Sequence, residues 1–244
     1  MQCWCNQVIM TTIEDNLQAQ VERIAAACQQ AGRGVTAVTL LAVSKTFSAE
    51  AVAETVAAGQ RAFGENYIQE GVEKILALRA SHPEAPLVWH CIGPIQSNKT
   101  RLVAEHFDWV QSVDRLKIAQ RLSEQRPPGL APLQVCLQVN VDGGANKSGV
   151  TPDELPALAD AVALLPQLRL RGLMCIPEPA PDFESQRALF LRGKVLFDAL
   201  QARHGASVDT LSMGMSDDLE AAVAAGATLV RVGRGIFGAR PAKG

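Results

Sequence analysis

The strongest constraint on the fold of this chain is a regular alternation of short apolar segments with amphipathic segments of helical period. Such alternation is typical of parallel βαβ units. The apolar, strand-like runs cover residues 37–44, 61–64, 87–92, 107–113, 132–141, 168–175, 208–212 and 228–233. The amphipathic stretches cover residues 49–58, 68–79, 116–124, 183–201 and 217–225. The pattern predicts about eight consecutive strand–helix units.

Eight such units favour a single (β/α)8 TIM barrel over an open doubly wound sheet, which usually has fewer strands and needs a reversal of strand order. The 244 residues suit one barrel, which typically needs roughly 250. A further helix is expected first, over about residues 12–31, because Thr11 and Glu14 have the spacing of a capping box. We therefore predict an N-terminal extension at residues 1–11 and one α/β barrel domain at residues 12–244.

Charge, hydropathy and cysteine spacing exclude several classes of partner. The formal net charge is −2 and the chain has no dense run of Lys and Arg, so neither nucleic acid nor a membrane surface is expected as a partner. No apolar stretch is long enough for a membrane span, and the first ten residues lack the pattern of a secretory signal. The six cysteines lack the spacing of metal ligands. We expect a cytoplasmic protein with free thiols and no metal site.

One lysine follows the first apolar run, where a barrel carries its active site. Active sites of parallel barrels lie at the carboxyl ends of the strands, and Lys45 shares one strand face with Leu41 and Val43. If that face points inward, Lys45 emerges at the mouth of the barrel. Partial desolvation there favours the neutral amine, which attacks an aldehyde to form an imine. A solvated lysine is the ordinary alternative, and position alone does not decide between the two.

The last apolar run contains a charged residue where apolar residues are expected. Arg231 shares one strand face with Leu229 and Gly233, so it points inward if that face lines the barrel. An inward guanidinium needs hydrogen-bond acceptors. The acceptor is either an atom of a bound ligand or a buried carboxylate of the protein, and both are open from the sequence.

Two glycine-bearing loops follow the last two runs, SMG at residues 212–214 and GRG at residues 233–235. Many barrels bind phosphate at this place. Glycines let backbone N–H groups approach an anion, and a short helix starting near Gly235 would direct its positive end at it. Ser212 can add a hydroxyl donor and Arg234 a charge. A lone Gly-x-Gly is weak evidence, but its position after the final strands favours a phosphate site.

Several longer motifs resemble one known family. They are AVSKT at residues 42–46, FGENY at 63–67, WHCIGPIQSNK at 89–99, LSMGMSDD at 211–218, and VRVG at 230–233 followed by IFG at 236–238. In this order, from about residue 12 to 240, they resemble the YggS/PROSC family of pyridoxal phosphate homeostasis proteins. The fold of that family is a barrel like the N-terminal domain of alanine racemase, which agrees with the strand count.

The resemblance implies a cofactor and the residues that bind it. Lys45 would hold pyridoxal 5′-phosphate (PLP) as a Schiff base, Arg231 would face the pyridine nitrogen and Asn66 would approach the ring. The phosphate would be surrounded by Ser212, Gly214, Gly233 and Arg234. Family members often have Thr or Ser in place of Arg234, so a backbone N–H or a salt link would replace a hydroxyl contact here.

The protein is expected to be a carrier of PLP. A permanently charged Arg231 keeps the pyridine nitrogen unprotonated, which weakens the electron sink that PLP enzymes use. The chain ends soon after the eighth run, so no second domain of the kind that completes alanine racemase is expected. We predict a monomeric PLP buffer, without catalytic residues, that supplies PLP to apo-enzymes. A PLP-dependent racemase or related small enzyme is the alternative, and binding of another phosphorylated metabolite without an imine is a third.

Three further polar residues have two interpretations each. His90 either faces the barrel mouth or is a core histidine satisfied by hydrogen bonds. Lys147 either contacts the ligand or lies in a solvated loop. Tyr67, the chain's one tyrosine, can act as a general acid only if it reaches the cofactor face.

Overall fold

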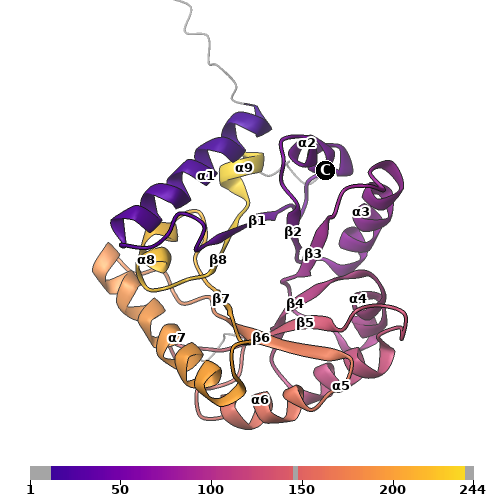
Figure 1. Cartoon of the computed structure of the whole chain (residues 1–244), viewed down its shortest axis with the longest axis vertical. Helices are drawn as coiled ribbons and strands as arrows, with labels where there is room; N and C mark the ends of the chain where they lie inside the picture. The colour runs from indigo at the N-terminus through magenta and orange to yellow at the C-terminus, as the bar shows by residue number, and fades with distance from the viewer. Residues whose placement is uncertain (1–11, 145–147, 240–244) are drawn as a thin grey trace, which may run out of the picture.

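Eight parallel strands form a closed barrel in chain order in the computed structural model, which describes residues 12–144 and 148–239. Figure 1 shows the strands as an inner ring with the helices outside it. The strands are β1 (Thr39–Val43), β2 (Ala62–Glu65), β3 (Val88–Cys91), β4 (Trp109–Val113), β5 (Leu133–Gln138), β6 (Leu168–Met174), β7 (Thr210–Ser212) and β8 (Leu229–Val232). The predicted single (β/α)8 barrel is confirmed. The predicted extension at residues 1–11 lies outside the described residues.

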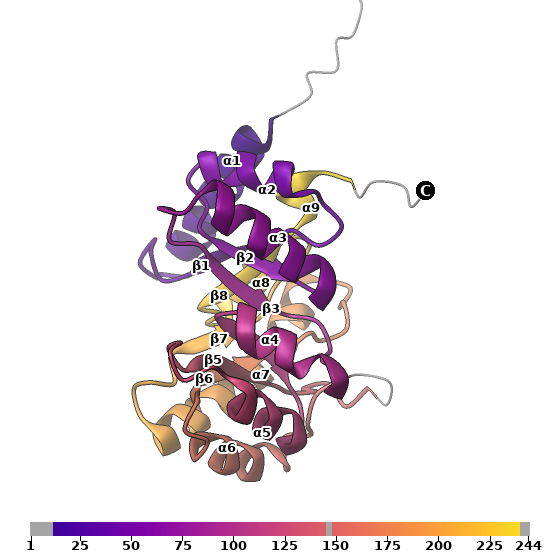
Figure 2. The same cartoon turned by 90° about the vertical axis from the view of Figure 1, so that its right-hand side faces the viewer.

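Helices α2 to α8 connect successive strands on the outside of the barrel. In Figure 2, α3, α4 and α5 follow one another along the side that faces the viewer. The helices are α1 (Ile13–Gln30), α2 (Ala49–Ala57), α3 (Ile68–Ser81), α4 (Thr100–His106), α5 (Leu116–Gln125), α6 (Leu155–Ala163), α7 (Phe183–His204), α8 (Leu219–Ala224) and α9 (Arg234–Phe237), and a 3-10 turn η1 (Ser97–Lys99) precedes α4. Neither α4 nor α6 was predicted. α4 has only seven residues, and α6 has nine residues that are mostly apolar and rich in alanine.

The extra N-terminal helix is confirmed, but its cap is one residue later than predicted. Thr12 accepts a hydrogen bond from the backbone N–H of Asp15, and the Asp15 carboxylate accepts one from the Thr12 N–H, at 3.1 and 3.2 Å. The sequence TTIED contains two overlapping frames of a threonine followed by an acid three residues later, and pattern alone does not separate them. The helix packs beside α8 and α9, as Figure 1 shows.

Side-chain alternation divides the strands into two buried surfaces. The outward side chains, among them Phe63, Trp89 and Val230, form the apolar core between the strands and the helices. The inward side chains of β1 and β8 include Leu41 and Arg231, which are paired in register where the two strands close the barrel. The predicted inward face therefore holds for both strands, and it directs the residues that follow them toward the barrel mouth.

Neither a membrane-spanning helix nor a metal centre is found among the described residues. No helix within residues 12–144 and 148–239 has the length and hydropathy to cross a bilayer. The same residues contain no cluster of His, Cys, Asp or Glu side chains that would hold a metal ion. The described cysteines, Cys28, Cys91, Cys136 and Cys175, are buried free thiols.

Candidate functional site

A cavity of ≈ 200 Å³ lies at the carboxyl ends of the strands, where β1, β2 and β8 come together. Apolar side chains also contribute to its wall, among them Ile92 and Met215. The predicted site residues that line it are Lys45, Asn66, Arg231, Gly233 and Arg234. The structure thus brings together residues from opposite ends of the chain, as the barrel topology requires.

Lys45 reaches the cavity because it continues the inward face of β1. Val43, two residues earlier, lines the same cavity, and Lys45 itself is half-buried. The chain then turns sharply, since Thr46 has a φ of 70°, in the left-handed region. The turn lets α2 begin at Ala49 on the outside of the barrel while the lysine stays at its mouth.

Arg231 is buried among neutral hydrogen-bond acceptors. Its guanidinium donates to the Ser212 hydroxyl oxygen at 2.7 Å and to the carbonyl oxygen of Cys175 at 3.1 Å. These partners differ from the buried carboxylate that was one of the two expectations. Burial lowers the pKa of Arg231 from its ordinary value, but a guanidinium remains protonated in proteins. The cavity therefore has a positive charge on the wall formed by β8.

A chain of hydrogen bonds runs from Arg231 across the interior of the barrel. The Ser212 hydroxyl donates to Gln111 Oε1 at 2.7 Å, and Gln111 Nε2 then donates to His90 Nδ1 at 2.9 Å. Burial lowers the pKa of His90 to about 3, so this imidazole is neutral near pH 7. His90 stacks on Trp109 and is a core histidine, the second of its two interpretations. This series of hydrogen bonds orients Arg231 from the interior of the barrel, beneath the cavity.

The position of Ser212 differs from the one expected for a phosphate donor. Its side chain is fully buried, and its hydroxyl both accepts from Arg231 and donates to Gln111. It is not part of the cavity wall. The reason is strand alternation, which directs the Ser212 side chain into the barrel instead of toward the loops above it. In this structure Ser212 acts on the cavity through Arg231.

The loop after β8 forms the rim of the cavity. Gly233 lines the cavity and α9 begins at the next residue, which confirms the short helix expected near Gly235. The Arg234 side chain is exposed and donates to the Asp217 carboxylate at 2.6 Å. This ion pair connects the loop after β8 to the loop after β7.

Gly214 supports the rim without lining the cavity. Its φ is 90°, and a Cβ on this residue would lie 2.4 Å from the Cβ of Ala222 in α8. Its carbonyl oxygen accepts the backbone N–H of Arg231. Gly214 therefore lets the loop after β7 pack closely on α8, and the residues that reach the cavity from that loop are Met215, Ser216 and Asp217.

Asn66 presents an unpaired amide oxygen beside the cavity. Its Oδ1 is buried and has no hydrogen-bond partner within the described structure. Gly93, in the loop after β3, packs directly against the Asn66 backbone, because a Cβ on Gly93 would lie 2.3 Å from the Asn66 carbonyl oxygen. A buried acceptor without a partner costs free energy, so this amide is suited to a polar ligand group.

Gly93→Ala is expected to lower the free energy of unfolding by about 1–3 kcal/mol, the usual cost of overpacking, because the new methyl group overlaps backbone that cannot move freely. Urea unfolding measures the change. Gly129→Ala is the matched control, since its added Cβ meets no atom within 4 Å. Equal unfolding midpoints for the two variants would show that the Gly93–Asn66 packing is not tight.

Sequence reasoning missed some residues of the wall. Ile176 and Met215 are exposed apolar residues in the loops after β6 and β7. Their position after a strand was the available signal, but apolar residues there look like ordinary loop residues. Tyr67 is 53% exposed and does not line the cavity. Asp218 accepts the N–H of Met215 just before α8, consistent with a structural role, and Lys147 lies outside the described residues.

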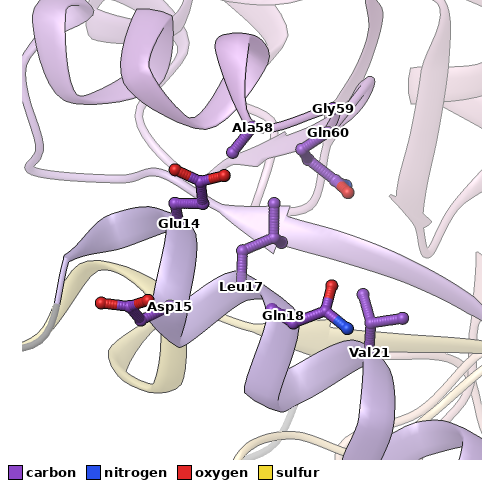
Figure 3. A pocket seen from close by; sticks show the side chains of 8 residues that line it. All are labelled: Glu14, Asp15, Leu17, Gln18, Val21, Ala58, Gly59 and Gln60. Atoms are coloured by element: carbon purple, nitrogen blue, oxygen red, sulfur yellow. The ribbon is translucent and has the colours of Figure 1, made fainter.

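Another cavity, of ≈ 330 Å³, lies between α1 and the turn from α2 to β2. Figure 3 shows Glu14 and Gln18 of α1 on one side of it and Gln60 on the other. It lies at the amino ends of the strands because residues 58–60 lead into β2. Its acidic residues, Glu14 and Asp15, would repel a phosphate. The cavity at the carboxyl ends is therefore the candidate site.

Comparison with known proteins agrees with the fold. Residues 14–241 match the family described as alanine racemase, N-terminal domain. A pyridoxal phosphate homeostasis protein of Pseudomonas aeruginosa is 60% identical over 231 residues, 95% of this chain and 97% of that protein. PipY of Synechococcus elongatus, solved without PLP, has a TM-score of 0.79 at 38% identity and covers 93% of this chain and 100% of its own.

The PipY structure with PLP bound has a TM-score of 0.78 at 35% identity, again covering 93% of this chain and 100% of its own. The family match, at residues 14–241, contains all eight strands and every residue that lines the candidate cavity. The likeness therefore includes the barrel mouth as well as the barrel. The chain belongs to the alanine racemase N-terminal domain family and, within it, to the pyridoxal phosphate homeostasis proteins.

Proposed function

We propose that this protein binds PLP in the cavity at the barrel mouth, holds it as a Schiff base on Lys45, and serves intracellular PLP homeostasis. The observation that carries the proposal is the meeting of one lysine amine, one buried guanidinium and a glycine-bearing helix start in a single ≈ 200 Å³ cavity. These groups match the aldehyde, the pyridine nitrogen and the phosphate of PLP. The PLP bound to PipY and the names of the relatives support it.

Each polar part of PLP has a suitable residue in the cavity. Arg231 offers a donor to the unprotonated pyridine nitrogen. Asn66 offers a carboxamide whose oxygen has no protein partner, which a polar ring substituent can complete. Gly233 allows backbone N–H groups at the start of α9 to approach the phosphate, and Arg234 lies at the rim, paired with Asp217. In this proposal Ser212 and Gly214 hold Arg231 and the loop after β7 in place.

Storage and supply of PLP fit the cavity better than catalysis. A charged arginine at the pyridine nitrogen weakens carbanion stabilisation. Within the described residues the cavity wall has neither histidine nor tyrosine, and its one carboxylate, Asp217, is paired with Arg234. A racemase needs acid and base groups on both faces of its substrate. We propose that the protein buffers PLP and supplies it to apo-enzymes. A cytoplasmic location and a monomeric state stay predictions.

The absorption spectrum of the PLP-treated protein, before and after borohydride, tests the Schiff base. We expect imine absorbance that borohydride removes, and mass spectrometry of the digest should then find a phosphopyridoxyl group on Lys45. Absence of that adduct from the Lys45 peptide would contradict the proposal. Exchange of amino-acid α-protons in deuterated buffer separates carrier from racemase, since turnover above that of free PLP would favour the enzyme.

A further inference from the structure

A cluster of three charged side chains lies behind the wall that carries Lys45, with Glu65 and Lys74 buried and Glu70 half-buried. Lys74, on the inner face of α3, is 5% exposed. Its ammonium group donates to Glu65 Oε1 at 2.8 Å and to Glu70 Oε1 at 2.6 Å. Neither Lys74 nor either glutamate lines the cavity, so the proposed binding of PLP does not by itself account for them.

The cluster holds the backbone on both sides of Lys45. Lys74 Nζ donates to the carbonyl oxygen of Ser44 at 2.7 Å, and Glu70 Oε1 accepts the backbone N–H of Thr46 at 2.6 Å. Because Lys74 and Glu70 are also paired with each other, one ion pair of α3 clamps the residue before Lys45 and the residue after it.

The clamped turn has an unfavourable backbone conformation. Among the described residues Thr46 is the one non-glycine residue with a positive φ, and its β-branched side chain makes that conformation costly. Outliers of this kind persist when surrounding contacts impose them, and they occur at functional sites. Here a contact of that kind is the hydrogen bond from the Thr46 N–H to Glu70.

Stability alone is a poor explanation for this cluster. Desolvation makes a buried ion pair expensive, and well-packed apolar residues often serve as well or better. Burial raises the pKa of Glu65, which reflects that cost, while Lys74 and the Ser44 hydroxyl oppose the rise. A role in fixing geometry explains why charged residues occupy these positions, because charged hydrogen bonds fix direction as well as distance.

We propose that Glu70 and Lys74 are positioning residues for Lys45, which they act on through the clamped backbone of Ser44 and Thr46. The proposal rests on the proposed function. Imine formation requires the neutral Lys45 amine to attack the aldehyde carbon of PLP, where a C=N bond replaces the C=O bond and the oxygen leaves as water with the two amine protons. The rate of this step depends on the position of the amine, which the turn sets.

The test compares Glu70→Ala with Glu70→Gln and with Glu73→Ala, a matched control at an exposed position of the same helix. The rate of imine absorbance after mixing with PLP is measured, together with the affinity for pyridoxine 5′-phosphate, which has no aldehyde. Glu70→Ala should slow imine formation by on the order of tenfold or more, because it releases the Thr46 N–H. Glu70→Gln keeps an acceptor oxygen and should restore most of the rate.

The pyridoxine 5′-phosphate affinity of Glu70→Ala should match that of the Glu73→Ala control, because the phosphate and ring contacts lie on other strands. Equal imine rates in Glu70→Ala and Glu73→Ala would overturn the positioning role. An equal loss of affinity for both ligands would also overturn it, since the cluster would then shape the whole cavity. Absence of imine in the unmodified protein would instead remove the proposed function, and this inference with it.

Discussion

Lys45→Ala is expected to abolish the imine absorbance of the PLP-treated protein completely, because no other described lysine lines the cavity. Some affinity for PLP should remain, since the contacts proposed for the phosphate and the ring come from β8 and the end of β2. Spectroscopic titration with PLP measures both effects, with fluorescence for the weaker complex that lacks the covalent bond.

Lys117→Ala is the matched control for this substitution, since Lys117 is exposed on α5, away from the cavity. It should keep both the absorbance and the affinity of the unmodified protein. If Lys45→Ala formed an imine of normal spectrum and a phosphopyridoxyl group appeared on another lysine after borohydride, the assignment of Lys45 would be wrong.

Arg231→Ala is expected to have the second largest effect, on both binding and folding. It removes the donor that the Ser212 hydroxyl and the Cys175 carbonyl share, and the loss of each hydrogen bond to a charged group costs about 1.5–3 kcal/mol. It also removes the charge that, in the proposed complex, keeps the pyridine nitrogen unprotonated, so the spectrum of bound PLP should shift. Urea unfolding, PLP titration and absorption spectra measure the three effects.

Arg101→Ala controls for the loss of an arginine. Arg101 is exposed and its ion pair with Glu105 spans 3.7 Å at the surface, where such pairs contribute about 0–1 kcal/mol. We expect nearly normal stability and binding for this variant. An Arg231→Ala protein with unchanged PLP affinity and spectrum would contradict the proposed place of Arg231 beside the pyridine nitrogen.

The barrel and the orientation of its key strands were predictable because both follow from short-range periodicity. Alternation along β1 places Leu41, Val43 and Lys45 on one face, and the same rule applies to Arg231 in β8. A parallel barrel then brings all strand ends to one mouth. These inferences need no knowledge of which side chains touch, so they hold without an atomic structure.

What the sequence did not reveal depends on contacts across the barrel. From its place at the end of β7, Ser212 was expected to contribute to a phosphate loop. In the structure its hydroxyl lies between Arg231 and Gln111, and Gln111 comes from β4, on another side of the ring. The reach of Glu70 from α3 to the N–H of Thr46 is of the same kind. Neither partner has a fixed spacing from the other along the chain, so no local pattern predicts them.

The seam between the first and last strands has a consequence for folding. Lys45 follows β1 and Arg231 lies in β8, and these two strands pair directly with each other when the ring closes. A nascent chain that has not yet formed β8 therefore lacks the side of the pocket that this strand and the loop after it contribute. A ligand that contacts residues on both sides of the seam binds only the closed ring. Its binding free energy therefore stabilises the pairing of β1 with β8 against transient opening. Hydrogen exchange of the backbone amides along this seam should therefore be slower with PLP bound than without it.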